Sequence, residues 1–320
     1  MGERTLFVFG NGFDIAHGIT TPYSAFREFL EKEHEEFLTT FEAMYSIQPL
    51  DDTEPWCTEE AQKRWKESVI KDLWQTFENE IGNPDVEGMY DHAFSLVDSM
   101  PEYGVRDTLD VYWKEQYSFV DDLQKFVLEW LQTIDCSAAT CKKDAMYGAN
   151  TDFFMTFNYT DTIERVYHIK NVFHPHGGVP SCSNVAPIMG HGNKYLIDSY
   201  RRKAIQAQSE SVEWYESICN AIADFCNSMY KDVDGIIESN QDFFEQIENV
   251  DKISVLGVSF GDVDIPYLER IRSAAKPEAK WYIYYYGDES KRRLKEVFGI
   301  LGISNRFETY FLPCDRFWDR

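Results

Sequence analysis

Six short apolar runs, separated by long stretches of helical periodicity, limit the fold of this chain more than any other feature of its sequence. Several of the runs are apolar at successive residues rather than at alternate ones, which is typical of strands covered on both faces in a parallel sheet. The runs that we expect to form strands are residues 5–10, 152–157, 171–174, 253–258, 280–286 and 307–312. The pattern predicts an α/β fold with a mostly parallel sheet.

The helical stretches divide into two groups along the chain. Four lie between the first two strands, at residues 23–40, 60–81, 86–97 and 112–131. The later ones, at residues 211–230, 233–247, 266–275 and 289–298, mostly alternate with strands as in βαβ units, which place helices on both faces of a sheet. We therefore expect an α/β core from residues 1–21 and 150–320, with residues 22–149 as a large helical insertion, or cap, after the first strand.

Charge and composition exclude several classes of protein. The chain has 31 basic and 55 acidic residues, a formal net charge of −24, which argues against affinity for nucleic acid through neutralised phosphates. No stretch approaches the about 18 uncharged apolar residues that a membrane helix needs. The seven cysteines are an odd number without a C-x-x-C pair, which is typical of a reducing compartment. These features predict a cytoplasmic protein that binds neither nucleic acid nor membranes.

The first strand is followed by a glycine-containing turn, Gly10-Asn11-Gly12-Phe13-Asp14. Two glycines one residue apart permit a tight turn and close approach of the backbone to a ligand. A helix that begins at this turn would aim free N–H groups at a phosphate. The third glycine of the G-x-G-x-x-G fingerprint is missing, so the turn alone is half of a dinucleotide signature.

Polar residues that could bind a ligand or take part in catalysis also follow the second and third strands. Asn158 comes directly after the second strand, where its amide could hold ribose hydroxyls or a water. Asp161 and Thr160 have a simpler interpretation as caps of the next helix. His176 precedes a glycine pair after the third strand, and a histidine there can act as a general base.

The loop after the fourth strand carries Ser259, Asp262 and Asp264. Pro266 is suited to the first turn of a helix, so Asp264 is expected just before a helix N-terminus, where its charge is favourable. Ser259 and Asp262 could hydrogen-bond a ribose or the loop backbone.

Four blocks of the sequence together resemble the AbiH family of bacterial abortive-infection proteins. They are GNGFDIAHGITTPYSAF, MTFNYTDTIE, HPHGG with the later GHG, and LGVSFGDVDIPYL. The resemblance implies a SIR2-like, Rossmann-type fold and a role in defence against phage. It also implies NAD as substrate or ligand.

The resemblance further implies roles for individual residues. In SIR2-like NAD hydrolases the glycine loop holds the pyrophosphate, which here assigns a nucleotide-binding role to the loop of Gly10, Asn11, Gly12 and Phe13. By the same resemblance Asn158 would engage the nicotinamide ribose, His176 would act as the base, and the Gly257-Val258-Ser259 turn would contact the adenosine ribose. Hydrolysis would release nicotinamide and ADP-ribose, with Asp14 or Asp262 stabilising developing positive charge.

Two other functions remain open from the sequence. The pocket could bind NAD or another nucleotide without turnover, in a sensor that contacts a second copy of itself or a partner protein of a defence system. Alternatively, His174 and His176 with Asp262 and Asp264 could hold a metal ion for phosphoester hydrolysis. Our expectation is a NAD glycohydrolase without a metal ion. The four-cysteine zinc module of SIR2-like deacetylases is missing, which argues against protein deacetylation.

Overall fold

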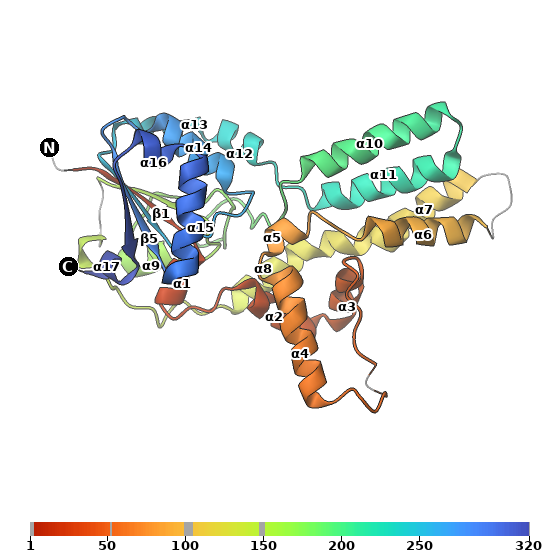
Figure 1. The fold of residues 1–320 in the computed structure, drawn as a ribbon. Helices are drawn as coiled ribbons and strands as arrows, with labels where there is room; N and C mark the ends of the chain where they lie inside the picture. The colour runs from red at the N-terminus through yellow and green to blue at the C-terminus, as the bar shows by residue number, and fades with distance from the viewer. Residues whose placement is uncertain (1–2, 52, 99–104, 147–150, 320) are drawn as a thin grey trace. The chain divides into compact units, whose positions relative to one another are not determined.

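The computed structural model describes residues 3–51, 53–98, 105–146 and 151–319. The chain forms two compact units (Figure 1). The α/β unit comprises Met1–Pro22, Leu128–Ile188 and Asp232–Arg320, and the helical unit comprises Tyr23–Val127 and Met189–Lys231.

A sheet of six parallel strands forms the centre of the α/β unit, in the order β3-β2-β1-β4-β5-β6. The strands are β1 (Thr5–Phe9), β2 (Phe153–Thr156), β3 (Val172–Phe173), β4 (Lys252–Leu256), β5 (Lys280–Tyr285) and β6 (Thr309–Pro313). The expected parallel sheet is therefore confirmed. The chain adds strands to one side of β1 and then to the other, so the order reverses between β1 and β4.

Both faces of the sheet are covered by helices, as the continuous apolar runs indicated. Leu6 and Val8 pack on one face with residues of α13, α14 and α15, whereas Phe7 and Phe9 pack on the other with α1, α9 and α17. The helices of this unit are α1 (Asn11–Ala16), α9 (Thr162–Tyr167), α12 (Val233–Ser239), α13 (Gln241–Gln246), α14 (Ile265–Ala274), α15 (Gly287–Ile300), α16 (Ile303–Arg306) and α17 (Asp315–Trp318), with short 3₁₀ turns η3 (Asp144–Met146) and η4 (Ile247–Asn249).

The helical unit is built from two separate stretches of the chain. The first, between β1 and β2, contains α2 (Tyr23–Glu33), α3 (Glu35–Ala43), α4 (Glu59–Val69), the π-helical turn η1 (Ile70–Trp74), α5 (Phe77–Glu80), α6 (Val86–Val97), α7 (Val105–Tyr117), the 3₁₀ turn η2 (Ser118–Asp122) and the first residues of α8 (Leu123–Thr133). The second contains α10 (Lys194–Ser209) and α11 (Glu213–Ser228), which lie side by side. The large helical insertion after the first strand is present.

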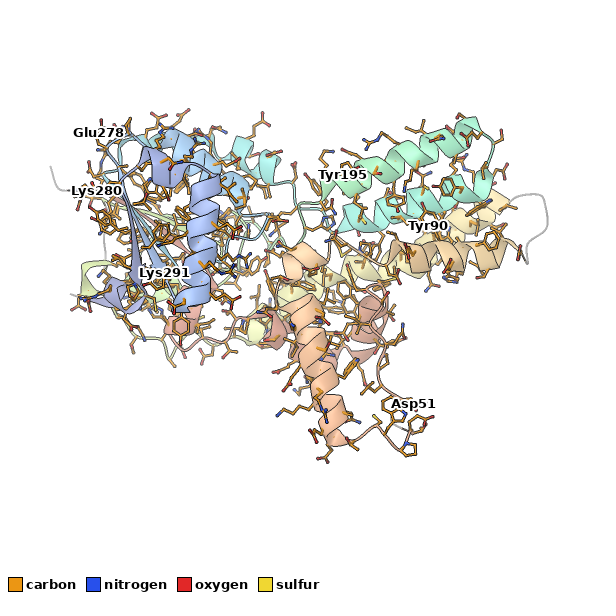
Figure 2. The ribbon with its side chains drawn as sticks, in the orientation of Figure 1. Asp51, Tyr90, Tyr195, Glu278, Lys280 and Lys291 are labelled. Carbon is orange, nitrogen blue, oxygen red and sulfur yellow. The ribbon has the colours of Figure 1, made fainter. Side chains whose placement is uncertain are left out.

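The division of the chain differs from the expected boundaries in two respects. The stretch that begins at Leu128, which we expected in the helical insertion up to residue 149, belongs to the α/β unit. Residues 189–231, which we expected in the α/β core, belong to the helical unit, and α10 was not expected as a helix at all. The reason is that α11 is apolar around much of its circumference and packs on α6, α7 and α10 rather than on the sheet. Tyr90 of α6 contacts the Sγ of Cys219 on α11 over 3.3 Å, while Tyr195 of α10 is exposed (Figure 2).

Two further expectations from composition can be compared with the structure. The seven cysteines are all free thiols, and Cys219 and Cys226 are buried on α11. Among the described residues, none of the helices combines the length and the apolar character needed to cross a membrane.

Candidate functional site at the carboxyl edge of the sheet

Two glycine loops meet where the strand order reverses. The amide of Gly10 donates to the carbonyl of Leu256 over 3.1 Å, and the amide of Gly12 donates to the carbonyl of Gly257 over 3.0 Å. A Cβ on Gly12 would lie 2.6 Å from the Cα of Gly257, whose own φ is +71°. Both loops therefore need glycine to pack against each other, whether or not a ligand binds.

The two other residues of the first loop make contacts inside the unit. The side-chain oxygen of Asn11 accepts a hydrogen bond from the hydroxyl of Thr21. Phe13 is fully buried, with its ring 4.2 Å from that of Phe9 and 4.5 Å from that of His17. The Phe13 ring belongs to the core, and its amide donates to the carbonyl of Gly10 over 2.8 Å.

Asp14 is a buried carboxyl group on α1. Its Oδ2 accepts a 2.6 Å hydrogen bond from the hydroxyl of Thr160, which follows β2. Burial raises the pKa of Asp14 to about 6, although hydrogen bonds from Thr160, Thr162 and Asn158 oppose the rise. The nearby charge of Glu164 adds to it. Asp14 therefore changes its charge close to neutral pH, as acids and bases at functional sites often do.

Asn158 connects the end of β2 to the first glycine loop. Its Nδ2 donates to the carbonyl of Gly10 over 3.1 Å, and its backbone amide donates to the hydroxyl of Thr156 over 3.1 Å. Its side chain is nearly buried. The amide group that we expected at this strand end is held in a fixed orientation beside the glycine loop.

His176 is paired with Asp264, the carboxylate that we expected just before a helix N-terminus. The Nε2 of His176 lies 3.5 Å from the Oδ1 of Asp264, and both residues are buried. The Oδ2 of Asp264 accepts from the amide of Gly261 over 3.2 Å, whereas its side chain makes no capping bond to α14. The ring of His176 also contacts Phe157, at a centroid distance of 5.1 Å, so it lies beside the turn that carries Asn158.

Ser259 and Asp262 lie on the same loop as Asp264 but are exposed. Between them Phe260 has a positive φ of 51° and packs on Phe298, which anchors the loop to the unit. The loop thus combines one buried carboxylate with two outward polar side chains.

The other histidines of the sequence cluster have separate surroundings. The Nε2 of His174 lies 2.7 Å from Glu164 rather than toward His176. His191 belongs to the helical unit, where Nε2 lies 2.9 Å from the carbonyl of Cys226 and burial lowers the pKa of the ring. His174, His176, Asp262 and Asp264 do not form one of the groups of potential metal ligands that converge among the described residues. The ligand set considered for phosphoester hydrolysis is not assembled.

Asp161 also differs from its expected role as a helix cap. It occupies the N-cap position of α9 without a side-chain capping bond. Instead it accepts hydrogen bonds from Arg165 and Ser181, at 2.8 and 2.7 Å. Burial would raise the pKa of Asp161, but these bonds outweigh it and lower the pKa.

A cavity of about 310 Å³ opens beside Thr160 in the α/β unit. Cys136, Asp161, Arg165 and Ser181 contribute to its wall. Thr160 therefore contacts Asp14 through its hydroxyl and also lines a space large enough for a small ligand.

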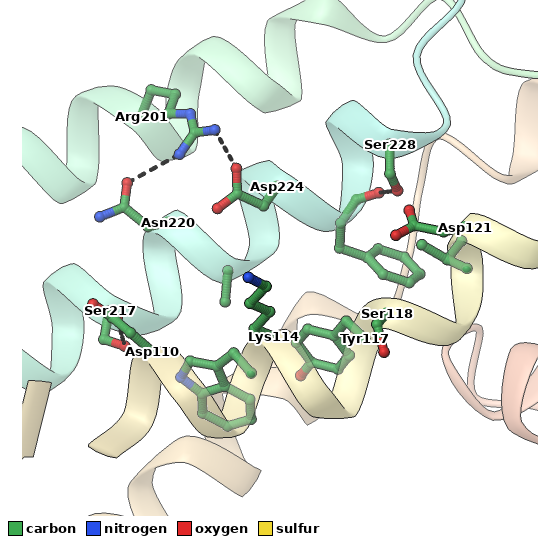
Figure 3. Close-up of a pocket in the computed structure, with 14 residues that line it drawn as sticks. Asp110, Lys114, Tyr117, Ser118, Asp121, Arg201, Ser217, Asn220, Asp224 and Ser228 are labelled. Carbon is green, nitrogen blue, oxygen red and sulfur yellow. Dashed lines mark hydrogen bonds and ion pairs between the residues drawn. The ribbon is translucent and has the colours of Figure 1, made fainter. Parts of the chain in front are cut away.

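The helical unit contains a cavity of its own, of about 540 Å³ (Figure 3). Its wall comes from α7, η2, α10 and α11, with Trp113, Tyr117 and Phe225 among its aromatic residues. Arg201 is already paired there, with Asp224 and with the side-chain oxygen of Asn220 at 3.1 Å. No residue that the sequence indicated as catalytic lines this cavity.

Comparison with known protein families identifies one family whose profile matches this chain. The profile of the family described as "Bacteriophage abortive infection AbiH" matches residues 6–285, which is most of the sequence. The chain belongs to the AbiH family. The matched range contains all four blocks on which the resemblance rested, and it makes this AbiH protein a phage-defence protein of the abortive-infection type. No curated protein matches the chain.

Proposed function

We propose that this AbiH protein hydrolyses NAD to nicotinamide and ADP-ribose at the carboxyl edge of the α/β unit. The observation that carries the proposal is the hydrogen bond from Asn158 to the carbonyl of Gly10. This bond holds the side-chain amide of Asn158, a group that can hydrogen-bond ribose hydroxyls, beside the point where the strand order reverses. Ligands of open parallel sheets bind at that point, and the order β3-β2-β1-β4-β5-β6 is that of doubly wound dinucleotide-binding sheets.

The reaction requires few catalytic groups. Nicotinamide leaves as a neutral molecule when the ribosyl bond breaks, because its ring nitrogen is cationic in NAD and takes the bonding electrons. The ribose passes through an oxocarbenium-like state and water adds to its anomeric carbon. His176 would accept the proton of that water, and Asn158 would orient the ribose and the water.

Two carboxylates support this assignment. Asp264 lies next to the Nε2 of His176, where its charge would stabilise the imidazolium formed during the reaction. Asp14, once ionised above a pH of about 6, would stabilise positive charge on the ribose. Activity is therefore expected to fall as the pH decreases through about 6.

The pyrophosphate would lie against the two glycine loops and be held by backbone amides other than those of Gly10, Gly12 and Phe13, which already donate within the fold. No basic side chain is needed for this. This fits a chain with a net charge of −24. Ser259 and Asp262, which are exposed on the β4–α14 loop, are the proposed contacts of the adenosine ribose.

The test is incubation of the purified full chain with NAD, with a chelator and without, followed by chromatography of nicotinamide and ADP-ribose. We expect chelator-insensitive release that falls at least about 100-fold in Asn158→Ala and in His176→Ala. The control is Lys63→Gln, because Lys63 is an exposed residue of the helical unit. Equal release by the control and by both site variants would contradict the assignment.

A second candidate function is a nucleotide-binding sensor without turnover. The 540 Å³ cavity of the helical unit favours it, because that cavity offers another place for a small ligand. A sensor would show a higher unfolding temperature with NAD or ADP-ribose and no nicotinamide release.

A further inference from the structure

Three side chains with metal-ligating atoms converge in the α/β unit, next to the proposed catalytic groups. They are Glu164 on α9, His174 after β3 and Cys182 in the turn that follows Gly178. One ligand atom from each lies within 4.8 Å of the other two. Because these residues are separated along the chain, no sequence motif indicates that they form a cluster.

The hydrogen bonds of His174 orient its ring for coordination. Its Nδ1 lies 3.2 Å from the carbonyl oxygen of Asn158, which can only accept, so Nδ1 carries a proton. Its Nε2 lies 2.7 Å from the carboxylate oxygen Oε1 of Glu164, a contact that a shared proton satisfies when no metal ion is bound. A metal ion would replace that proton after a small separation of the two side chains. Metal-bound histidines commonly donate their other N–H to a backbone carbonyl in this way.

The surroundings of the cluster also favour an ion. The Oε2 of Glu164 is buried, and no hydrogen-bond donor from the described residues reaches it. Gly178 packs closely against the other two residues, because a Cβ there would lie 2.9 Å from the Sγ of Cys182 and 3.4 Å from the Nδ1 of His174. A thiolate and a carboxylate together would neutralise a divalent ion.

We propose that Glu164, His174 and Cys182 bind one divalent transition-metal ion of the zinc class. The combination of sulfur, imidazole nitrogen and carboxylate oxygen suits zinc, whereas magnesium and calcium prefer oxygen ligands alone. Three protein ligands leave the fourth tetrahedral position for water or another ligand.

The proposal departs from the expectation of a protein without a metal ion. It is independent of NAD hydrolysis, since its test measures metal binding alone.

The experiment is titration of the chelator-treated full chain with Co²⁺, monitored by the near-ultraviolet absorption band of a cobalt–thiolate bond. We expect one equivalent to bind with this band. Cys182→Ser should abolish the band, and Glu164→Gln should weaken binding at least about tenfold. Cys314→Ser is the matched control, because Cys314 is also half-buried beside a carboxylate, Asp315, at 3.9 Å, and should leave the band unchanged.

A second measurement needs no variant. Zn²⁺ should slow alkylation of Cys182 in the wild-type chain at least about tenfold, as followed by mass spectrometry of its peptide, and should leave Cys314 unaffected. A cobalt–thiolate band that persists in Cys182→Ser, the absence of any band in the wild type, or unchanged alkylation of Cys182 with Zn²⁺ would each overturn the proposal.

Discussion

Both units of the protein bury charged side chains, but they differ in how those charges are compensated. In the helical unit Arg27 is 1% exposed, and its Nε donates to Glu42 over 2.8 Å. The carboxylate of Glu42 also accepts from the Nε1 of Trp74 over 2.7 Å. The buried Lys231 pairs with Glu78 in the same unit. These charges are joined into pairs that serve the packing of helices.

In the α/β unit the buried Asp161 is likewise paired with a cation, Arg165, but the buried Asp14, His176 and Asp264 near the strand ends have different surroundings. Asp14 takes a hydrogen bond from a neutral hydroxyl rather than from a cation, and His176 lies 3.5 Å from Asp264. Such groups can still change protonation state or accept a ligand. The comparison indicates that the buried pairs of the helical unit stabilise its packing, whereas Asp14, His176 and Asp264 of the α/β unit are available for chemistry. Variants can test both statements.

The largest effect is expected at the carboxylate beside His176. Asp264→Asn should lower kcat for NAD hydrolysis by about 10²–10⁴, the range of general-base contributions, because the imidazolium loses its stabilising charge. Steady-state kinetics would measure it. Asp262→Asn on the same loop should raise KM and leave kcat near its original value, since Asp262 is exposed and proposed only to bind. Equal kcat values for both variants would remove Asp264 from the chemistry.

A comparable free-energy change is expected from breaking the pair in the helical unit. Glu42→Gln should lower the free energy of unfolding by about 3–5 kcal/mol, because Arg27 would remain buried without its carboxylate. Urea denaturation would measure this loss. Glu67→Gln removes an exposed partner that lies 4.0 Å from Lys63, and it should cost less than about 1 kcal/mol. Similar losses in the two variants would refute a structural role for the buried pair.

Asp14 should make stability depend on pH in the opposite direction from an ordinary ion-paired carboxylate. Its pKa is about 6 in the folded protein, against an ordinary value of 3.8. The stability that Asp14 contributes is therefore full below pH 3.8 and is lost as the pH rises through 6. Asp14→Asn should therefore stabilise the fold by up to about 3 kcal/mol above pH 7 relative to its effect at pH 4. Urea denaturation across this range is the measurement. A difference between variant and wild type that does not change with pH would contradict the raised pKa.

The smallest effects are expected at glycines. Gly12→Ala should destabilise the protein by about 1–3 kcal/mol, since its Cβ would meet the backbone of Gly257. Gly299→Ala in α15 has nothing within 4 Å of the added Cβ and should stabilise the helix by up to about 1 kcal/mol. Thermal unfolding would distinguish the two, and a neutral Gly12→Ala would show that the loops do not need to approach so closely.

The sequence predicted the sheet well because its signal is local. Each strand is a short, nearly continuous apolar run, and the observed ends differ from the expected ones by at most two residues. Helix α10 was missed because its buried positions, Ile197, Tyr200, Ala204 and Ala207, are separated by charged and polar residues. The available signal in the sequence was Asn193, a residue type that favours the N-cap position. In the structure its side chain accepts from the amide of Leu196 at the start of α10.

The candidate site was predictable only in part. Asn158, Asp14 and His176 were found because the carboxyl ends of parallel strands meet at one edge. The partnerships of His176 with Asp264 and of His174 with Glu164 join separate segments, and no spacing along the chain encodes them. The glycines of the first loop were expected to admit a ligand, but their closest neighbour is the loop of Gly257, which only the tertiary fold could reveal.

The most direct test of the account is hydrogen–deuterium exchange of the full chain with and without ADP-ribose, read by mass spectrometry. The account predicts slower exchange in the segments 9–16, 156–162, 174–178 and 257–265 of the α/β unit, with residues 23–127 of the helical unit unchanged. Protection confined to the helical unit, or no protection at ADP-ribose concentrations well above those of the assay, would contradict the assignment of nucleotide chemistry to the carboxyl edge of the sheet.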